Sequence, residues 1–272
     1  MADIAVIAIH GMGTQADGFS EGLRSRLVDE LDDLGSDTDG IHWKEILWAD
    51  ILSDRQSRYL TDAQDSPGPP SSYFGLRPFV VHSLGDAAAY QVATGRPGST
   101  YEKIHQRISD RISDLYQEIG SQPAPTVVFA HSLGSHIISN YIWDAYSNPP
   151  TGPAANASDF ERLEWLAAMI TFGSNIPLFT FAFDPVTPID FPRPALPEPH
   201  RSNASWHNYY DRHDILGYPL KPISPEYADA VTEDHEINAG GLIQSVTPLS
   251  HVEYWTDNTF VKEAAQIVAR FL

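Results

Sequence analysis

The stretch "TVVFAHSLGSHIISN", residues 126–140, contains the pattern that decides the fold. Its first part, residues 126–130, is a short apolar run with β-branched residues, which is typical of a strand buried on both faces. Apolar residues then recur at helical spacing, at Leu133, Ile137, Tyr141 and Ala145. Ser132 stands between these segments, with the small residues Ala130 and Gly134 two positions away on either side. The stretch therefore predicts a buried strand, a sharp turn at Ser132 and a helix.

The tetrapeptide His-Ser-Leu-Gly occurs twice, around Ser132 and around Ser83. A serine hydroxyl becomes an effective nucleophile at a sharp strand-to-helix turn, where its oxygen stands clear of the backbone and can meet a histidine. The residues two positions before and after the serine must then be very small. Ser83 instead follows the β-branched Val81, and Pro78 lies where a central strand would need an N–H donor. We predict that Ser83 lies inside a helix with Pro78 in its first turn, and that Ser132 is the candidate nucleophile.

Outward from this stretch, apolar runs typical of buried strands alternate with amphipathic helices. The predicted strands cover residues 3–9, 41–49, 126–130, 166–174, 205–210 and 233–239. The predicted helices cover residues 19–35, 101–120 and 133–145, followed by a C-terminal helix with one face made of Phe260, Ala264, Ile267, Val268 and Phe271. This alternation predicts a doubly wound, mostly parallel sheet flanked by helices, an α/β fold, in a single domain over residues 1–272.

Two segments differ from this alternation. Residues 61–75 are polar and rich in proline, serine and glycine, which predicts a surface loop. The segment around residues 177–200 combines repeated prolines with several aromatic residues, and such prolines exclude a long helix or a central strand. We interpret it as an ordered loop draped over the domain, or as the wall or lid of a substrate pocket.

Composition limits the possible partners. Asp and Glu outnumber Lys and Arg by 36 to 17, which gives a formal net charge of −19 and opposes binding to nucleic acids or anionic lipid headgroups. The absence of cysteine excludes disulfides, thiolate nucleophiles and thiolate metal ligands. The chain has no run of eighteen apolar residues and no basic segment at its start, so we expect no membrane insertion, no signal peptide and a cytoplasmic location.

Several motifs together resemble the α/β-hydrolase superfamily, and within it the serine esterases and lipase-like enzymes. "AHSLG" at residues 130–134 resembles their nucleophile elbow, with Ala130 in place of the first glycine, and "HGMG" after the first strand resembles their oxyanion loop. The resemblance assigns the oxyanion-binding donors to the backbone N–H groups of Met12 and Leu133. Taken without the resemblance, "HGMG" is a tight turn after a strand, and in both interpretations His10 is a structural residue.

The order of catalytic residues in this superfamily is serine, acid and histidine, so the base should precede the last helix. His251 in "SHVEYW" has this position; the alternatives are His207, His213 and His235, of which His235 alternates as a strand residue. The segment "DRHD" offers the acid. "DILG" resembles the pattern of an aspartate followed by apolar residues and a glycine, which favours Asp214 and leaves Asp211 as the alternative.

These residues predict a serine hydrolase of carboxylic esters that uses Ser132, His251 and Asp214 and needs no cofactor. The alternatives are an acyltransferase or thioesterase with the same residues, and a binding protein that retains the fold without turnover. Metal catalysis is not expected, because "DRHD" with His207 or His235 is a weak cluster and the helical metal motifs H-x-x-x-H and H-E-x-x-H are absent. The expected partner is a small ester with an apolar acyl or alcohol group.

Overall fold

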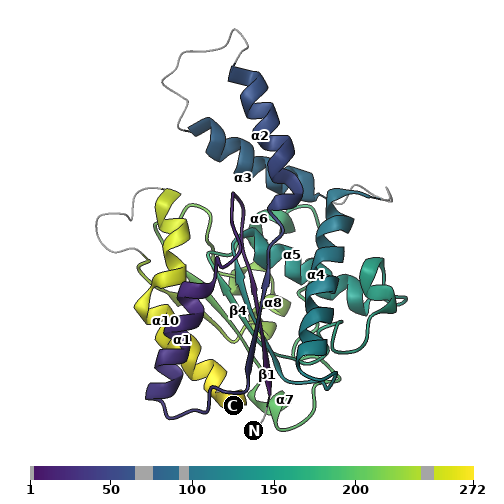
Figure 1. The fold of residues 1–272 in the computed structure, drawn as a ribbon, viewed down its shortest axis with the longest axis vertical. Coiled ribbons are helices and arrows are strands. Elements are labelled where there is room, and N and C mark those ends of the chain that lie inside the picture. The colour runs from purple at the N-terminus through teal and green to yellow at the C-terminus, as the bar shows by residue number, and fades with distance from the viewer. Residues whose placement is uncertain (1–2, 65–75, 92–97, 240–247) are drawn as a thin grey trace.

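The computed structural model describes residues 3–64, 76–91, 98–239 and 248–272, and these residues form one six-stranded sheet with helices on both faces (Figure 1). The strand order is β2-β1-β3-β4-β5-β6, and every neighbouring pair is parallel. The strands are β1 (Ile4–Ile9), β2 (Ile41–Ile46), β3 (Thr126–His131), β4 (Leu166–Phe172), β5 (Ser205–Tyr210) and β6 (Glu233–Glu236). The predicted fold class is therefore confirmed.

Two hydrophobic cores lie on opposite faces of the sheet, because successive side chains of a strand point to opposite sides. On one face Ile4 and Val6 of β1 pack with the apolar stripes of α1 (Glu21–Asp33) and α10 (Asn258–Val268). On the other face Ile7 and Ile9 pack with α4 (Thr100–Glu118) and α5 (Leu133–Tyr146). Strands buried on both faces explain the continuous apolar runs in the sequence.

Short helices lie between the later strands or follow β6, the last strand in the described chain. The α-helical ones are α6 (Ile176–Thr180), α7 (His200–Asn203) and α8 (Pro225–Ala230). The 3₁₀ helices are η2 (Gly152–Asn156), η3 (Lys221–Ile223), η4 (Pro248–Thr256) and η5 (Ala269–Phe271). Apart from α6 and α7, the segment around residues 177–200 has no regular structure, as its prolines predict.

Two helices that connect β2 to α4 project from the end of the sheet opposite the chain termini (Figure 1). They are α2 (Asp50–Gln64) and α3 (Leu76–Tyr90). The predicted surface loop over residues 61–75 is wrong for residues 61–64, which end α2, and its remaining residues lie outside the described part of the chain. The sequence of α2 is polar on most of its circumference, so it lacks the apolar stripe by which a helix is found.

The second His-Ser-Leu-Gly tetrapeptide lies within α3, as predicted. Ser83 is buried there, and no histidine of the described chain bonds to its hydroxyl. The neighbouring His82 does not bond to this hydroxyl, because its ring bonds to Gln56 of α2. Ser83 therefore lies inside a helix, and of these two serines Ser132 is the one at a strand-to-helix turn.

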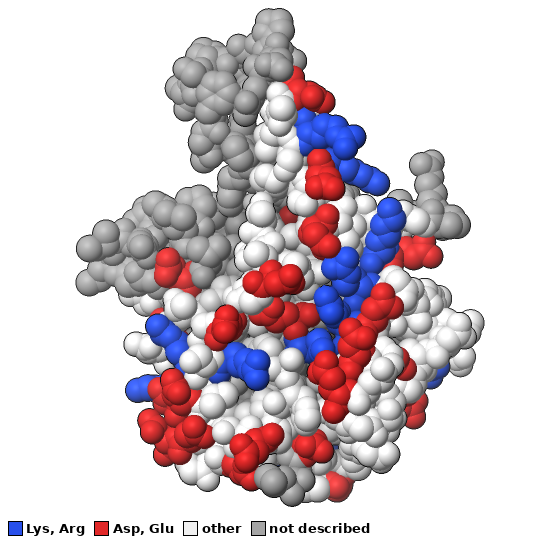
Figure 2. Space-filling view, in the orientation of Figure 1, with Lys and Arg blue, Asp and Glu red and all other residues white. Residues whose placement is uncertain are grey.

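The surface carries both signs of charge. On the face shown in Figure 2, Lys and Arg side chains lie among Asp and Glu side chains. The ion pair of Arg107 with Asp50, at 3.1 Å between Nη2 and Oδ2, is one of several exposed pairs in the described chain.

None of the described helices is both long enough and apolar enough to cross a membrane.

Candidate active site

Ser132 occupies the sharp turn between β3 and α5. Its backbone has φ 52° and ψ −125°, a left-handed conformation that is unusual for a residue with a side chain. The turn needs Gly134, because a Cβ atom there would lie 2.5 Å from the carbonyl oxygen of His10. Ala130 is fully buried in the same crowded region. The small residues flanking Ser132 thus allow the strained turn predicted from the sequence.

The turn places Ser132 against His251, which lies 119 residues further along the chain. Ser132 Oγ is 2.6 Å from His251 Nε2, and His251 Nδ1 is 2.7 Å from Asp214 Oδ2. His251 belongs to η4, between β6 and α10, so the predicted position is confirmed although the segment is a 3₁₀ helix and not an open loop. All three side chains are buried. A neutral imidazole that donates from Nδ1 to the carboxylate presents its Nε2 lone pair to the serine hydroxyl.

The acid in contact with His251 is Asp214, while Asp211 has other partners. Asp211 Oδ1 accepts a hydrogen bond of 2.8 Å from the N–H of His213, and its Oδ2 has no partner in the described chain. Asp214 also accepts from the Tyr254 hydroxyl at 2.9 Å and from the Leu216 N–H at 2.9 Å. The glycine of "DILG" is required by close packing, since a Cβ at Gly217 would lie 2.5 Å from Asp214 Oδ2.

These donors keep Asp214 ionised. Burial alone raises the pKa of a carboxyl group, but the hydrogen bond and charge of His251, with the N–H of Leu216 and the hydroxyl of Tyr254, hold the pKa of Asp214 below its usual value. An ionised Asp214 can accept the Nδ1–H of His251 and stabilise the imidazolium that forms when the ring takes a proton.

The segment after β1 lies directly against the Ser132 turn. A Cβ at Gly11 would be 2.5 Å from Ser132 Cβ, so only glycine permits this approach. His10 Nε2 accepts a 3.1 Å hydrogen bond from the N–H of Trp48, which leaves Nδ1 to donate to the Gly11 carbonyl at 2.7 Å. Because a trans peptide is planar, fixing the Gly11 carbonyl also fixes the direction of the Met12 N–H. His10 is therefore a structural residue, as predicted, and it fixes the direction of the Met12 N–H.

The same segment is tied to the projecting helices. Asp86 of α3 accepts a 2.9 Å hydrogen bond from the N–H of Gly13, and its other oxygen accepts from Gln56 of α2 at 2.6 Å. Burial raises the pKa of Asp86, although these hydrogen bonds and the charge of His82 act to lower it. Residues of α2 and α3 thus hold the "HGMG" segment in place, and no sequence motif predicts this contact.

Two further residues support the site and were missed by the sequence analysis. His131 Nε2 donates to the backbone carbonyl of His251 at 2.7 Å, which holds η4 against the Ser132 turn. Tyr254 bridges the two aspartates, because its hydroxyl accepts from the N–H of Asp211 at 2.8 Å and donates to Asp214. Only the position of His131 beside Ser132 could have suggested its role.

Removing the hydroxyl of Tyr254 should destabilise the fold measurably. Tyr254→Phe leaves the buried N–H of Asp211 without its acceptor, and we expect the free energy of unfolding to fall by about 1–3 kcal/mol. Urea unfolding monitored by circular dichroism measures this change. Tyr218→Phe is the matched control, because the hydroxyl of Tyr218 bonds to an exposed carbonyl on the same loop and its loss should cost much less. Equal losses in the two variants would contradict the bridging role.

Buried histidines predict a loss of stability in mild acid. Burial lowers the pKa of His10 to about 4, and burial with the nearby His251 lowers the pKa of His131 to about 3. In the unfolded chain a histidine titrates near pH ~6.5. Below this pH the unfolded state therefore binds more protons than the folded state. The free energy of unfolding is largest above pH ~6.5 and should fall by about 1.4 kcal/mol per pH unit for each such histidine as the pH drops toward ~4.

Urea unfolding at several pH values between about 7.5 and about 4.5 tests this dependence. His131→Gln retains a donor for the His251 carbonyl and should reduce the slope by about one proton. A slope that is the same in the wild type and in His131→Gln would show that His131 is not held neutral by the fold.

The other candidate histidines lie elsewhere. His213 is exposed in the turn between Asp211 and Asp214, and His207 and His235 contact each other on β5 and β6. His235 is a strand residue, as predicted. Of the four candidate bases, the structure therefore brings only His251 to Ser132.

A cavity of about 340 Å³ lies beside the next turns of α5. His136, Ser139 and Asn140 of α5 line one side, and the segment after β4 forms an apolar wall that includes Phe179 and Phe183. The proline-rich segment lines this cavity, and its role as the wall or lid of a substrate pocket stays a prediction. Ser132 is not among the lining residues; it lies one helical turn before His136.

No protein-family model matches the chain, and no curated protein matches its sequence. Among solved structures, the chain is similar to esterase PE8, with 14% identity, a TM-score of 0.46, and coverage of 100% of this chain and 94% of that chain. It is also similar to a structure of the metagenome-derived lipolytic enzymes LipS and LipT, with 13% identity, a TM-score of 0.39, and coverage of 99% and 94%. At these scores the fold assignment depends on the architecture itself.

That architecture has several specific parts. The sheet is parallel with helices on both faces, and a strained serine turn joins β3 to α5. A histidine after β6 contacts that serine, and an aspartate after β5 contacts the histidine. The chain order serine, aspartate, histidine is the order of the α/β-hydrolases. The chain has the α/β-hydrolase fold.

Proposed function

We propose that the protein is a serine hydrolase that cleaves carboxylic esters through an acyl-enzyme intermediate. The observation that carries the proposal is the continuous chain of contacts from Ser132 Oγ to His251 Nε2, at 2.6 Å, and from His251 Nδ1 to Asp214 Oδ2, at 2.7 Å. This arrangement activates a hydroxyl nucleophile, because the imidazole can take the serine proton and the carboxylate stabilises the resulting cation.

In the proposed reaction, Ser132 Oγ attacks the acyl carbonyl while His251 Nε2 takes its proton. His251 then returns that proton to the departing alcohol, and the acyl group remains bonded to Ser132. A water molecule, deprotonated by His251, attacks the acyl-enzyme; the acid leaves and the serine regains its proton. The scheme uses only groups of the chain and water.

We assign the oxyanion-binding donors to the backbone N–H groups of Met12 and Leu133. Two observations support the assignment. Leu133 directly follows Ser132 at the start of α5, where the first N–H groups of a helix have no partner within the helix. The Gly11 to Met12 peptide is fixed by His10 and lies against Ser132.

The apolar wall of the cavity beside α5 favours substrates with an apolar acyl or alcohol group. Its residues Ile176, Phe179 and Val186 contribute to the core cluster that also contains the start of α5. A cavity of about 340 Å³ has room for a small ester group or a short chain.

Hydrolysis of p-nitrophenyl esters of increasing acyl chain length tests the proposal. We expect p-nitrophenol release by the wild type, with a preference for one range of chain length, and an initial burst if deacylation is slow. If added alcohols accelerate p-nitrophenol release and yield new esters, the acyltransferase alternative is favoured; selective turnover of thioesters favours a thioesterase. No turnover of any acyl substrate by folded protein would favour a binding protein and contradict the proposal.

A further inference from the structure

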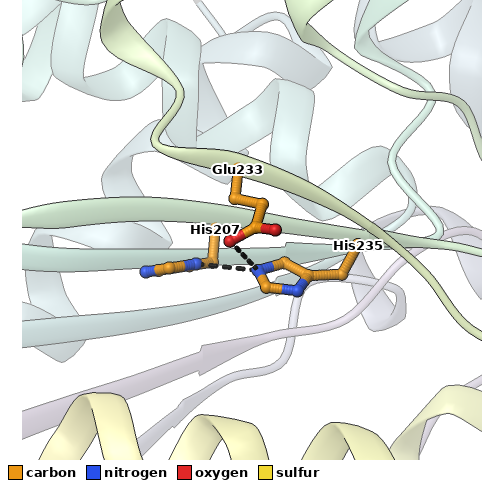
Figure 3. A group of neighbouring side chains, drawn as sticks. All are labelled: His207, Glu233 and His235. Atoms are coloured by element: carbon orange, nitrogen blue, oxygen red, sulfur yellow. Dashed lines mark hydrogen bonds and ion pairs between the residues drawn. The ribbon is translucent and has the colours of Figure 1, made fainter.

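A second group of titratable side chains lies on β5 and β6, outside the site of Ser132, His251 and Asp214. His207, Glu233 and His235 point toward one another from the two neighbouring strands (Figure 3). The parallel register places His207 opposite Glu233 and Tyr209 opposite His235, so all four side chains are on the same face of the sheet. β6 is the last strand in the order of the described sheet.

The nitrogen and oxygen atoms of this group converge. His207 Nδ1 is 2.9 Å from His235 Nε2, and His235 Nε2 is 3.8 Å from Glu233 Oε2. All three atoms lie within 4.8 Å of one another. Two ligands bound to one tetrahedral zinc ion lie about 3.3–3.6 Å apart, given Zn–N and Zn–O distances of about 2.0–2.2 Å. One observed separation lies below that range and the other above it, so small side-chain movements suffice to bind an ion.

The ring of His235 is held in the orientation that a metal ligand needs. Its other nitrogen, Nδ1, is at ion-pair distance, 3.2 Å, from Glu263 Oε2 on α10, an oxygen that has no hydrogen-bond partner in the described chain, and the ring stacks on Tyr209 with centroids 4.5 Å apart. A carboxylate beside Nδ1 favours the proton on that nitrogen, which leaves the lone pair on Nε2. That lone pair faces His207 Nδ1 and Glu233, which are the other two converging groups.

Burial changes gradually across the group. His207 is only 7% exposed, and its Nε2 has no hydrogen-bond partner in the described chain. His235 is partly buried, and Glu233 is exposed at the edge of the sheet. An ion can therefore reach the group from solvent beside Glu233 and meet a buried imidazole behind it. Both imidazoles can bind the ion in their neutral form. The proton of His207 can lie on Nε2 instead of Nδ1, which leaves the lone pair of Nδ1 for the ion.

We propose that His207 Nδ1, His235 Nε2 and Glu233 Oε2 bind one Zn²⁺ ion, with Glu263 as the carboxylate that orients His235. Two imidazoles and one carboxylate suit zinc, and the chain has no cysteine to compete for it. The ion would connect β6 to β5 and, through His235 and Glu263, to α10. Sequence spacing predicted no metal site because the ligands come from paired strands and not from one helix.

Zinc titration of the untagged protein, after dialysis against a chelator, tests the proposal. Competition with a chromophoric indicator should give one Zn²⁺ bound per chain, and thermal denaturation should show a higher Tm when Zn²⁺ is added. His207→Gln and His235→Gln should lose this binding. Glu263→Gln should weaken it by about 10- to 100-fold, as expected for a residue that orients a ligand. X-ray absorption of the bound zinc should show two imidazole ligands.

His213→Gln is the matched control, because it removes an exposed histidine outside the group and should bind zinc like the wild type. Glu233→Gln provides a second test if a histidine variant fails to fold, since Glu233 is exposed and its loss should weaken binding without unfolding the protein. The proposal is overturned if no stoichiometric zinc binds, or if the wild type and all of the folded variants bind zinc equally.

Discussion

Replacing Ser132 by alanine is expected to reduce kcat/KM for ester hydrolysis by about 10⁶-fold, to a level set by the remaining groups of the site. The variant has no oxygen at the turn to form the acyl-enzyme, and His251 has no hydroxyl to deprotonate. Steady-state rates on the best p-nitrophenyl ester of the wild type measure the loss. The fold should be unchanged, because alanine keeps the Cβ that packs against Gly11.

Ser83→Ala is the matched control for this variant. It changes the other His-Ser-Leu-Gly tetrapeptide, whose serine lies inside α3 and has no histidine bonded to it in the described chain. The activity of Ser83→Ala should stay within a few-fold of the wild type. A comparable loss in both variants, or activity retained in Ser132→Ala, would show that the wrong serine has been assigned.

Replacing Asp214 by asparagine is expected to reduce kcat/KM by about 10⁴-fold. The amide of asparagine can donate a hydrogen bond to His251 Nδ1. The imidazole then has to hold its proton on Nε2, so Nε2 cannot accept a proton from Ser132. The variant also loses the negative charge that stabilises the imidazolium. The rate on the same ester measures the loss, and the loss should appear mainly in kcat.

Asp211→Asn separates the two candidate acids. Asp211 Oδ1 only accepts the N–H of His213, which the oxygen of an asparagine side chain can also accept, so this variant should retain nearly full activity. If Asp211→Asn lost as much activity as Asp214→Asn, the hydrogen bond between His251 and Asp214 would not be the one that matters in the reaction.

The sequence was sufficient for those parts of the fold that local patterns determine. The strand before Ser132, the small residues on either side and the helical spacing after it are all within fifteen residues of sequence, and the structure has the predicted turn there. The position of His251 between the last strand and the last helix followed from chain order. The choice between Asp214 and Asp211 followed from the glycine of "DILG", which the close packing of Gly217 explains.

The remaining features depend on contacts that local patterns do not contain. The helix α2 was missed because its surface is polar on most sides and its partners, on α3, lie beyond residues 65–75. The contact of His131 with the His251 carbonyl spans 120 residues. His207 and His235 meet only through the register of two parallel strands, and no spacing along one segment indicates it.

The most direct test of the proposed activity is labelling with a fluorophosphonate probe, which bonds covalently to activated serines, followed by mass spectrometry of the modified peptide. Ser132 is expected to be the labelled residue in the wild type and in Ser83→Ala, and Ser132→Ala is expected to remain unlabelled. Folded wild-type protein that takes up no label, or a label on any serine other than Ser132, would contradict the claim that His251 and Asp214 activate Ser132.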